Sequence, residues 1–448
     1  MHEISPIDGR YQKICQPLRE FFSEFALTKF RVFVEIEYFL QLAQENFFSL
    51  SHDEKEKIKI IFLNFSEKDF ENIKNLEKET NHDVKSVEYF LKNKFSKISE
   101  NVKENLEFIH FGLTSEDINN LAYALMVKNS IKKIFFPELK KLQQTILQKV
   151  EQWKSVAMLS WTHGQPATPT TMGKEWLIFY RRIERQLQQL ENQEFLGKLA
   201  GASGNFSAHH FAFPDFDWLN FSKKFVEKLE LICNPIVSQI EPHDFIAEIS
   251  HLFFRISTIL IDFSRDSWGY ISRGFFQQIS KKNEVGSSAM PHKINPIDFE
   301  NAEGNLGLSR SLFLHFSEKL PISRFQRDLS DSTVFRNLGV SFSHFFLGIK
   351  SVLRGISKIE INSEKISSDL SSHPEILAEA VQTILRKNKI AGGYELLKKF
   401  SRGKNFSKQE LQIFSSDLLI SEIDKKKLID LSPEKYIGLA EKIIEKFS

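Results

Sequence analysis

Apolar residues recur every three or four positions over long stretches of this chain, and this periodicity constrains the fold more than any other feature. One such stretch, 171–195, has no proline and no glycine after Gly173. As a helix it would be close to 40 Å long at about 1.5 Å per residue. Strand-like alternation is scarce. The sequence therefore predicts an all-α chain built around a bundle of long helices. The two clearest apolar stripes are Phe135, Leu139, Leu142, Ile146 and Val150, and Phe245, Ile249, Leu252, Ile256, Leu260 and Phe263.

Three segments rich in Gly, Ser, Thr or Pro interrupt the helical pattern, at 160–169, 201–205 and 281–296. The string TSED at 114–117 is typical of a helix start, because a hydroxyl can cap backbone N–H groups and acids suit the positive helix end. A chain of 448 residues is too long for one core. We predict three helical domains, at 1–111, 112–365 and 366–448, of which the central one holds the long bundle.

The charge balance excludes a general nucleic-acid binder, because 60 basic and 58 acidic residues give a net charge of only +2. The two cysteines, Cys15 and Cys233, are too few for a disulfide framework. The N-terminus lacks a secretory pattern, and no apolar run approaches the roughly 18 residues that a membrane span needs. We therefore expect a cytoplasmic protein. Phosphate loops, dinucleotide fingerprints and zinc-type spacings are absent, so we expect neither a metal nor a cofactor.

The most specific chemical signal is the string GSSAMPHKINP at 286–296. Its serine, lysine and asparagine side chains, together with free backbone N–H groups, suit a carboxylate ligand. For a generic Gly-Ser loop a plain linker would be the better interpretation, but this string resembles the signature of the fumarase/aspartase superfamily. In that superfamily the loop carries the catalytic serine.

Other strings resemble the adenylosuccinate lyase branch of this superfamily. His292 stands where fumarases and aspartases usually have Gly and argininosuccinate lyases usually have Gln. The other matching strings are SPIDGRY at 5–11, TNHDVK at 80–85, HFGLTSED at 110–117, THGQP at 162–166, QIEPHD at 239–244 and SRFQRDLSDSTVFR at 323–336. The alternatives are another fumarate-releasing lyase, such as argininosuccinate lyase, and a structural protein built on the same scaffold.

The resemblance implies that fumarate is eliminated from adenylosuccinate, giving AMP, and from the succinylated imidazole-carboxamide ribotide SAICAR, giving AICAR. It implies Ser287 as the general base and His163 as the general acid, with Lys293 stabilising charge and with His82 and Glu300 as supporting catalytic residues. A histidine titrates near neutrality, which suits an acid that must be reprotonated. The implied substrate-binding residues are Arg10, Tyr11, Asn81, His82, Asp83, Thr114, Ser115, Gln239, Ser288, Lys293, Asn295, Asn301, Arg327, Ser332, Thr333 and Arg336.

The resemblance also implies a homotetramer that pools its long helices into one core, with active sites shared between subunits. Arginine suits the phosphate and carboxylates of such a substrate, because its planar fork pairs bidentately with oxyanions. For Arg324 and Arg327 the alternative is a surface ion pair, and for Asn119 and Asn120 it is simple packing. The choice of Ser287 over Ser288 as the base follows from its position in the superfamily string.

Overall fold

The computed structural model describes residues 2–279, 290, 294–401 and 408–448. The chain forms two compact units, each built from three separate segments. Unit 1 comprises 1–139, 186–258 and 304–349, and unit 2 comprises 140–185, 259–303 and 350–448. Most described residues are helical, which confirms the predicted all-α class. The predicted domain boundaries at 111 and 365 follow a different division, by sequence segment, and stay predictions.

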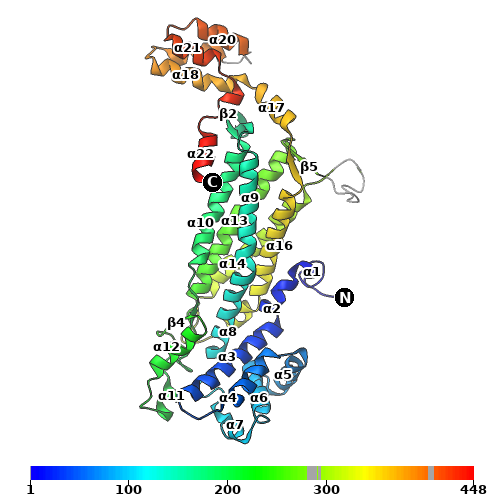
Figure 1. The fold of residues 1–448 in the computed structure, drawn as a ribbon, viewed down its shortest axis with the longest axis vertical. Coiled ribbons are helices and arrows are strands. Elements are labelled where there is room, and N and C mark those ends of the chain that lie inside the picture. The colour runs from blue at the N-terminus through cyan, green and yellow to red at the C-terminus, as the bar shows by residue number, and fades with distance from the viewer. Residues whose placement is uncertain (1, 280–289, 291–293, 402–407) are drawn as a thin grey trace. The chain divides into compact units, whose positions relative to one another are not determined.

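The N-terminal part of unit 1 is organised around one buried helix, α3 (Glu24–Gln44). It begins after Ser23, whose Oγ accepts a hydrogen bond from the Ala26 N–H at 3.0 Å. Figure 1 shows the shorter helices gathered beside α3, and α4, α5, α6 and α8 all contact it. These helices are α4 (His52–Leu63), α5 (Glu67–Thr80), α6 (Asp83–Phe95), α7 (Glu100–Glu104) and α8 (Ser115–Ser130).

The long helices follow the predicted stripes. Helix α8 leads through a π-helical turn (Ile131–Phe135) into α9 (Phe136–Gln152), and the later rods are α10 (Met172–Glu191), α13 (Asp244–Ser272), α14 (Ile297–Lys319) and α16 (Leu338–Ile356). Phe135, Leu139, Leu142, Ile146 and Val150 are all fully buried, which confirms the first stripe. In unit 1, Phe135 packs against Phe253 and Phe342, with ring centroids 5.6 and 5.0 Å away. The abundant phenylalanine therefore fills the helical core, at positions where it buries a large apolar area.

Unit 2 contains a feature that periodicity did not predict. The Gly- and Pro-rich segment 160–169 belongs to an antiparallel hairpin of β1 (Ala157–Thr162) and β2 (Gln165–Thr171). A two-stranded ribbon tolerates proline because each strand has one edge without a partner. Short pairs also join β3 (Leu196–Gly197) to β4 (Ile232–Cys233) in unit 1 and β5 (Phe276–Gln278) to β6 (Ile359–Ile361) in unit 2.

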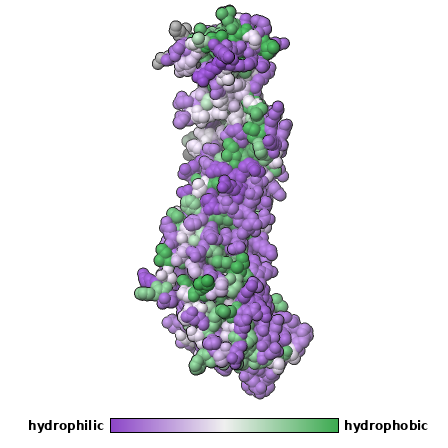
Figure 2. Space-filling model, turned by 90° about the vertical axis from the view of Figure 1, so that its left-hand side faces the viewer, coloured by the Kyte–Doolittle hydropathy of each residue, from purple (hydrophilic) through white to green (hydrophobic). Residues whose placement is uncertain are grey.

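The C-terminal helices of unit 2 share one apolar cluster. Leu370, Leu377, Val381, Leu411 and Leu428 are buried in it, together with Leu159 of β1. Exposed apolar side chains also occur on these helices, and Figure 2 shows apolar patches beside hydrophilic surface there. None of the helices in the described residues is both long and apolar enough to cross a membrane. The helices are α17 (Ser363–Ser371), α18 (Ala378–Lys387), α19 (Gly393–Ser401), α20 (Lys408–Ser416), α21 (Glu422–Ile429) and α22 (Ala440–Phe447).

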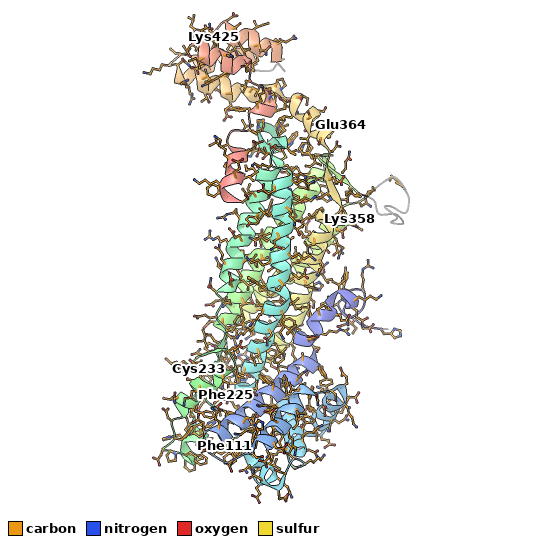
Figure 3. The ribbon with its side chains drawn as sticks, viewed as in Figure 1. Phe111, Phe225, Cys233, Lys358, Glu364 and Lys425 are labelled. Atoms are coloured by element: carbon orange, nitrogen blue, oxygen red, sulfur yellow. The ribbon has the colours of Figure 1, made fainter. Side chains whose placement is uncertain are left out.

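The remaining helices of unit 1 are short. An aromatic cluster involves the helix that contains Trp218 and Phe225. Phe111 packs against Trp218, and Phe225 packs against Tyr38; Phe111 and Phe225 are labelled in Figure 3. These short helices have 4 to 11 residues each. They are α1 (Gln12–Cys15), α2 (Arg19–Phe22), α11 (Ser207–Ala212), α12 (Trp218–Lys228) and α15 (Ser330–Phe335).

Candidate active site

The predicted site residues fall into three groups. Ser287, Ser288 and Lys293 lie outside the described residues, as does His292. Four more belong to unit 2, namely His163, Asn295, Glu300 and Asn301. The others belong to unit 1, and they are Arg10, Tyr11, Asn81, His82, Asp83, Thr114, Ser115, Gln239, Arg327, Ser332, Thr333 and Arg336.

The start of α8 brings Ser115 close to His82. Thr114 precedes the helix, and its N–H donates to the Asp117 carboxylate at 2.9 Å, which forms one half of the predicted cap. His82 precedes α6, and its Nδ1 accepts the Lys85 N–H at 3.1 Å. A neutral ring with an accepting Nδ1 carries its proton on Nε2. That Nε2 lies 3.5 Å from Ser115 Oγ, so a proton donor and a hydroxyl face each other at a helix N-terminus.

Asp83 links the same region to two arginines. Its Oδ2 lies 2.8 Å from Arg31 Nη2 and 3.2 Å from Arg336 Nη2. Arg336 Nη1 also contacts Glu24 at 2.9 Å. Burial raises the pKa of Asp83, but Arg31 and the Val84 N–H outweigh it, so that the net pKa is lowered and the carboxylate is favoured. Arg336 is thus held between two carboxylates rather than free.

Arg31 and Glu24 were not among the predicted residues, although Arg31 had a sequence signal. It lies on the buried face of α3, four residues after Leu27 and three before Val34, which are both apolar and buried, and its side chain is only 3% exposed. A charge buried beside such residues indicates a buried partner. Arg31 Nε donates to Asn119 Oδ1 at 2.9 Å, so Asn119 has a polar role rather than simple packing.

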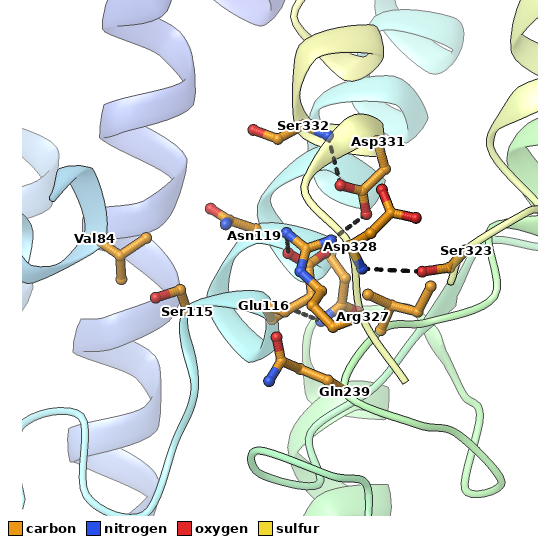
Figure 4. A network of polar contacts seen from close by, with 12 residues as sticks. Val84, Ser115, Glu116, Asn119, Gln239, Ser323, Arg327, Asp328, Asp331 and Ser332 are labelled. Atoms are coloured by element: carbon orange, nitrogen blue, oxygen red, sulfur yellow. Dashed lines mark hydrogen bonds and ion pairs between the residues drawn. The ribbon is translucent and has the colours of Figure 1, made fainter. Parts of the chain in front are cut away.

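Arg327 lies in the network drawn in Figure 4, between the carboxylates of Glu116 and Asp331. Its Nη2 is 3.4 Å from Glu116 Oε2, and its Nη1 contacts Asp331 directly. Its side chain is 21% exposed, so Arg327 is not a surface ion pair. Burial raises the pKa of Glu116, although the charges of His243 and Arg327 nearby oppose this rise.

His243 completes this network from the segment before α13. Its Nε2 is buried and lies 3.6 Å from Asp331 Oδ2, too far for a hydrogen bond. One possible metal-ligand atom from each of Glu116, His243 and Asp331 lies within 4.8 Å of the other two, an arrangement that could hold a metal ion. The Arg327 guanidinium already supplies positive charge to both carboxylates, and a metal cation there would be repelled by it. We therefore interpret this group as an ion-pair network.

Gln239 lies beside Arg327 in Figure 4. Its Nε2 donates to the Ala202 carbonyl at 2.9 Å, and the neighbouring Ser238 Oγ donates to the Gln326 carbonyl at 3.1 Å. These two bonds hold the segment at 238–239 against the 201–205 turn and against the loop that carries Arg327. Ser332 lies in α15, where its N–H donates to Asp331 at 2.6 Å, and Thr333 follows it on the same helix.

Arg10 and Tyr11 lie just before α1. The Arg10 guanidinium is 5.9 Å from the Tyr11 ring centroid, and the Tyr11 N–H donates to the Pro6 carbonyl at 2.8 Å. Tyr11 also packs on a small cluster that contains Cys15 and Leu347. These contacts join the N-terminal segment to α16.

His163 occupies the tip of the β1–β2 hairpin in unit 2. His163 and Gly164 both have positive φ, 54° and 72°, and they join the paired residues Thr162 and Gln165 as a two-residue turn. The His163 side chain is exposed. Close to the hairpin turn, at the Trp161↔Pro166 pair, the Arg273 guanidinium lies 3.6 Å from the Trp161 ring centroid. Unit 2 thus presents an imidazole to solvent on a short, braced ribbon.

The first turn of α14 carries two further predicted residues. Glu300 Oε1 accepts the Trp268 Nε1–H at 3.1 Å, and Asn301 Oδ1 accepts the Ser351 hydroxyl at 3.1 Å. Asn295 lies two residues before this helix, next to Ile294, whose carbonyl accepts a hydrogen bond from Gln278 Nε2 at 2.8 Å. Trp268 was not predicted, and nothing in its helical surroundings marked it.

Two family models match the chain. The Lyase model matches residues 9–308, and the Adenylosuccinate lyase C-terminal model matches residues 323–437. Among solved structures, a fumarate lyase from Mesorhizobium sp. BNC1 has a TM-score of 0.79 at 16% identity over 96% of this chain and 97% of that chain. A 3-carboxy-cis,cis-muconate lactonizing enzyme from Pseudomonas putida has a TM-score of 0.77 at 18% identity over 96% of both chains. At such low identity these structures establish the fold alone.

Curated relatives agree over the full length of the chain. An adenylosuccinate lyase from Legionella pneumophila (strain Corby) is 49% identical over 100% of this chain and 99% of its own length. One from Buchnera aphidicola subsp. Schizaphis graminum is 48% identical over 99% and 98%, and one from Dictyostelium discoideum is 47% identical over 97% and 96%. The chain is therefore a lyase that belongs to the adenylosuccinate lyase family of the fumarase/aspartase superfamily.

Proposed function

We propose that this enzyme eliminates fumarate from adenylosuccinate, giving AMP, and from SAICAR, giving AICAR. One observation carries the proposal. Four distant segments that carry predicted substrate residues meet in unit 1 through direct contacts, which link His82 to Ser115, Asp83 to Arg336, and Ser238, next to Gln239, to the carbonyl of Gln326, next to Arg327. The relatives named adenylosuccinate lyase, about 48% identical over the whole chain, give the substrate its identity.

The elimination needs one base and one acid. The base removes a proton from the carbon beside a carboxylate, the electrons of that C–H bond form the C=C bond of fumarate, and the C–N bond breaks. The departing nitrogen then takes a proton from the acid. We assign Ser287 as the base and His163 as the acid, from their places in the superfamily strings. Lys293 would stabilise the serine alkoxide and the doubly charged carboxylate of the intermediate.

The binding groups suit a phosphorylated dicarboxylate. Arg327 and Arg336 offer guanidinium donors, and Ser115 stands at the N-terminus of α8, where the positive end of the helix dipole favours an anion. Because carboxylates already hold both arginines, their forks are fixed before the substrate arrives. Gln239 would contact a polar edge of the base or the succinyl group. The reaction changes no net oxidation state, so it needs no redox cofactor.

We further propose that the enzyme is a homotetramer with active sites shared between subunits. His163 is exposed at its hairpin tip, and apolar side chains are exposed on the long helices, including Trp268 at 46%, Leu308 at 56% and Leu314 at 41%. Large apolar side chains exposed on long helices would be buried if such helices packed together between subunits. Mixing His163→Ala and Ser287→Ala tetramers after dissociation should restore turnover, because some mixed sites regain both groups. An active monomer in sedimentation would contradict the shared sites.

An ultraviolet assay with adenylosuccinate tests the reaction itself. We expect turnover to AMP and fumarate by the purified protein. Thermal unfolding with AMP and, separately, with argininosuccinate distinguishes the two lyase functions, because only the true ligand raises the melting temperature. Turnover of argininosuccinate with no effect of AMP would overturn the proposal.

A further inference from the structure

A fully buried ion pair lies beside the start of α8 in unit 1. Asp117 and Lys198 are both 0% exposed, and Lys198 Nζ lies 2.8 Å from Asp117 Oδ1. Burying two charges is expensive, and good geometry with further hydrogen bonds is needed to compensate. Neither residue has a part in the proposed acid–base chemistry, so the pair calls for a different explanation.

The Asp117 carboxylate joins two segments of backbone. It accepts the Thr114 N–H at the start of α8, and it also accepts the Ala200 N–H at 2.8 Å and the Gly201 N–H at 3.2 Å. Asn120, one turn along α8, bonds both the N–H and the carbonyl of Lys198, at 2.8 and 3.0 Å. A carboxylate can accept this many donors at once because its two oxygens carry about four lone-pair sites.

The segment held by Asp117 runs directly into the 201–205 turn. Gly201 and Gly204 have φ of 76° and 77°, a conformation that other residues rarely adopt. A Cβ on Gly204 would lie 2.2 Å from the Val237 carbonyl oxygen, so the turn packs tightly against the segment before Gln239. Gln239 Nε2 bonds Ala202 within this turn. Contacts therefore lead from Asp117 to Ser115 on one side and to Gln239 on the other.

We propose that Asp117, neutralised by Lys198, is a positioning residue that sets the spacing between Ser115 and Gln239 in the nucleotide pocket. This inference rests on the proposed function, which assigns both of those residues to substrate binding. Asp117 itself is buried and touches no substrate. It acts by fixing the start of α8 and the 201–205 turn relative to each other.

The test compares Lys198→Met, at a fully buried lysine, with a control variant, Lys387→Met, at a lysine that is 58% exposed. Lys387 Nζ lies 2.7 Å from Asp424, a carboxylate that is 2% exposed among the C-terminal helices. Each variant removes a cation from a buried aspartate. We expect Lys198→Met to raise KM for adenylosuccinate on the order of tenfold with a smaller change in kcat, because misplaced binding groups weaken substrate contacts. Lys387→Met should leave both constants unchanged.

The double variant Asp117→Asn with Lys198→Met keeps the test valid if Lys198→Met alone does not fold, because it leaves no unpaired buried charge. We expect its KM to rise as well, since an amide offers one acceptor oxygen where the carboxylate offers two. Wild-type KM in every folded variant would overturn the proposal. So would an equal rise in KM for Lys387→Met, which would reveal a general loss of stability.

A double-mutant cycle tests the route of the effect. If Lys198 acts through Ser115 and Gln239, its effect on KM should be less than additive with Ser115→Ala and with Gln239→Ala. Full additivity would contradict the coupling. If the wild type does not turn over adenylosuccinate, the proposed function fails. If it does, and the Ser115 and Gln239 variants raise KM while Lys198→Met does not, only this inference fails.

Discussion

Arg327 in unit 1 is enclosed by carboxylates, whereas His163 in unit 2 stands at an exposed hairpin tip. The first side chain has its partners within the unit, Glu116 and Asp331, both nearly buried. The second lies in a turn with two positive φ angles, and Arg273 braces the neighbouring Trp161, but the His163 ring faces solvent. The Arg327 region satisfies its charges within unit 1, whereas the hairpin tip presents an imidazole to solvent.

This difference separates two requirements of the proposed reaction. Binding groups benefit from being fixed in advance, because they then stabilise charge without reorganising. A proton donor must instead reach the departing nitrogen of a substrate that other residues hold. Substitutions in the two regions should therefore differ in kind. Those in unit 1 should affect stability and binding together, and those at the hairpin tip should affect turnover alone.

The largest effect is expected for His163→Ala. Loss of the general acid should lower kcat for adenylosuccinate by roughly 10²–10⁴-fold. Because the side chain is exposed, the free energy of unfolding should change by no more than about 0.5 kcal/mol. The ultraviolet assay and denaturant unfolding measure the two quantities. The matched control is His210→Ala, an exposed histidine on α11, which should keep full activity. Equal loss in both variants would remove His163 from the chemistry.

The second effect is expected for Arg327→Met. It leaves Glu116 and Asp331 buried without their cation, and breaking a buried pair of this kind costs about 3–5 kcal/mol. Denaturant unfolding should show this loss, together with weaker AMP binding. Arg324→Met is the matched control, because Arg324 lies three residues away with its side chain 81% exposed. If the two variants were equally stable, Arg327 would be an ordinary surface pair after all.

The sequence predicted the parts of this molecule that depend on local patterns. The stripe from Phe135 to Val150 needs only helical spacing to be recognised, and the cap before Ser115 needs only neighbouring residues. The 160–169 hairpin was missed because strand pairing depends on register, and proline argued against strands. The pairing of Arg31 with Asp83 was missed because 52 positions separate the two residues.

The site residues came from strings that resemble a family, not from physical pattern. That resemblance named His82 and Ser115, which the structure brings within 3.5 Å, and it named Arg336 and Asp83, which form an ion pair. It did not name Asp117 or Lys198, although both lie in or beside interpreted strings. Buried positioning residues leave little trace in one sequence, because the charge they neutralise belongs to a distant segment. The roles of Ser287 and Lys293 stay predictions.

The third effect concerns a buried histidine in unit 1, His209. The single hydroxyl proton of Tyr38 goes to the Phe111 carbonyl at 2.7 Å, so His209 Nε2, 3.1 Å from that hydroxyl oxygen, carries a proton and donates it. Nδ1 is then the unprotonated nitrogen, and it is buried with no partner in the described residues. Burial lowers the pKa of His209 from its ordinary 6.5 to about 4, although the charge of Asp117 opposes this.

The sign of the resulting pH dependence follows from proton binding. Between pH 6.5 and 4 the unfolded chain holds more protons at this residue than the folded chain, so stability falls as the pH falls through this window. The loss attributable to His209 is on the order of 3 kcal/mol by pH 4. His209→Gln should flatten the measured slope, and His210→Gln, its exposed neighbour, should not. Subtracting the wild-type curve of unfolding free energy against pH from that of each variant cancels the contributions of the other titratable groups. Identical slopes would show that His209 titrates normally.

The smallest effect is expected for Arg273→Met, beside Trp161 near the tip of the hairpin. Trp161 Nε1 is buried without a hydrogen-bond partner in the described residues, so this ring is held by packing and by the guanidinium 3.6 Å from its centroid. A cation–π contact of this kind is worth about 0.5–2 kcal/mol. Its loss should loosen the ribbon and lower kcat a few-fold, because His163 lies only two residues beyond Trp161.

Arg182→Met is the matched control for Arg273→Met, since Arg182 lies over the Phe179 ring at 5.4 Å on α10 and does not touch the hairpin ring. It should leave kcat unchanged. Steady-state kinetics of the two variants decide between two roles for Arg273. A few-fold loss confined to Arg273→Met is what a brace for the hairpin requires. A loss as large as that of His163→Ala would mean that Arg273 contacts the substrate, and the hairpin would then be a binding region in its own right, as fixed as the network around Arg327.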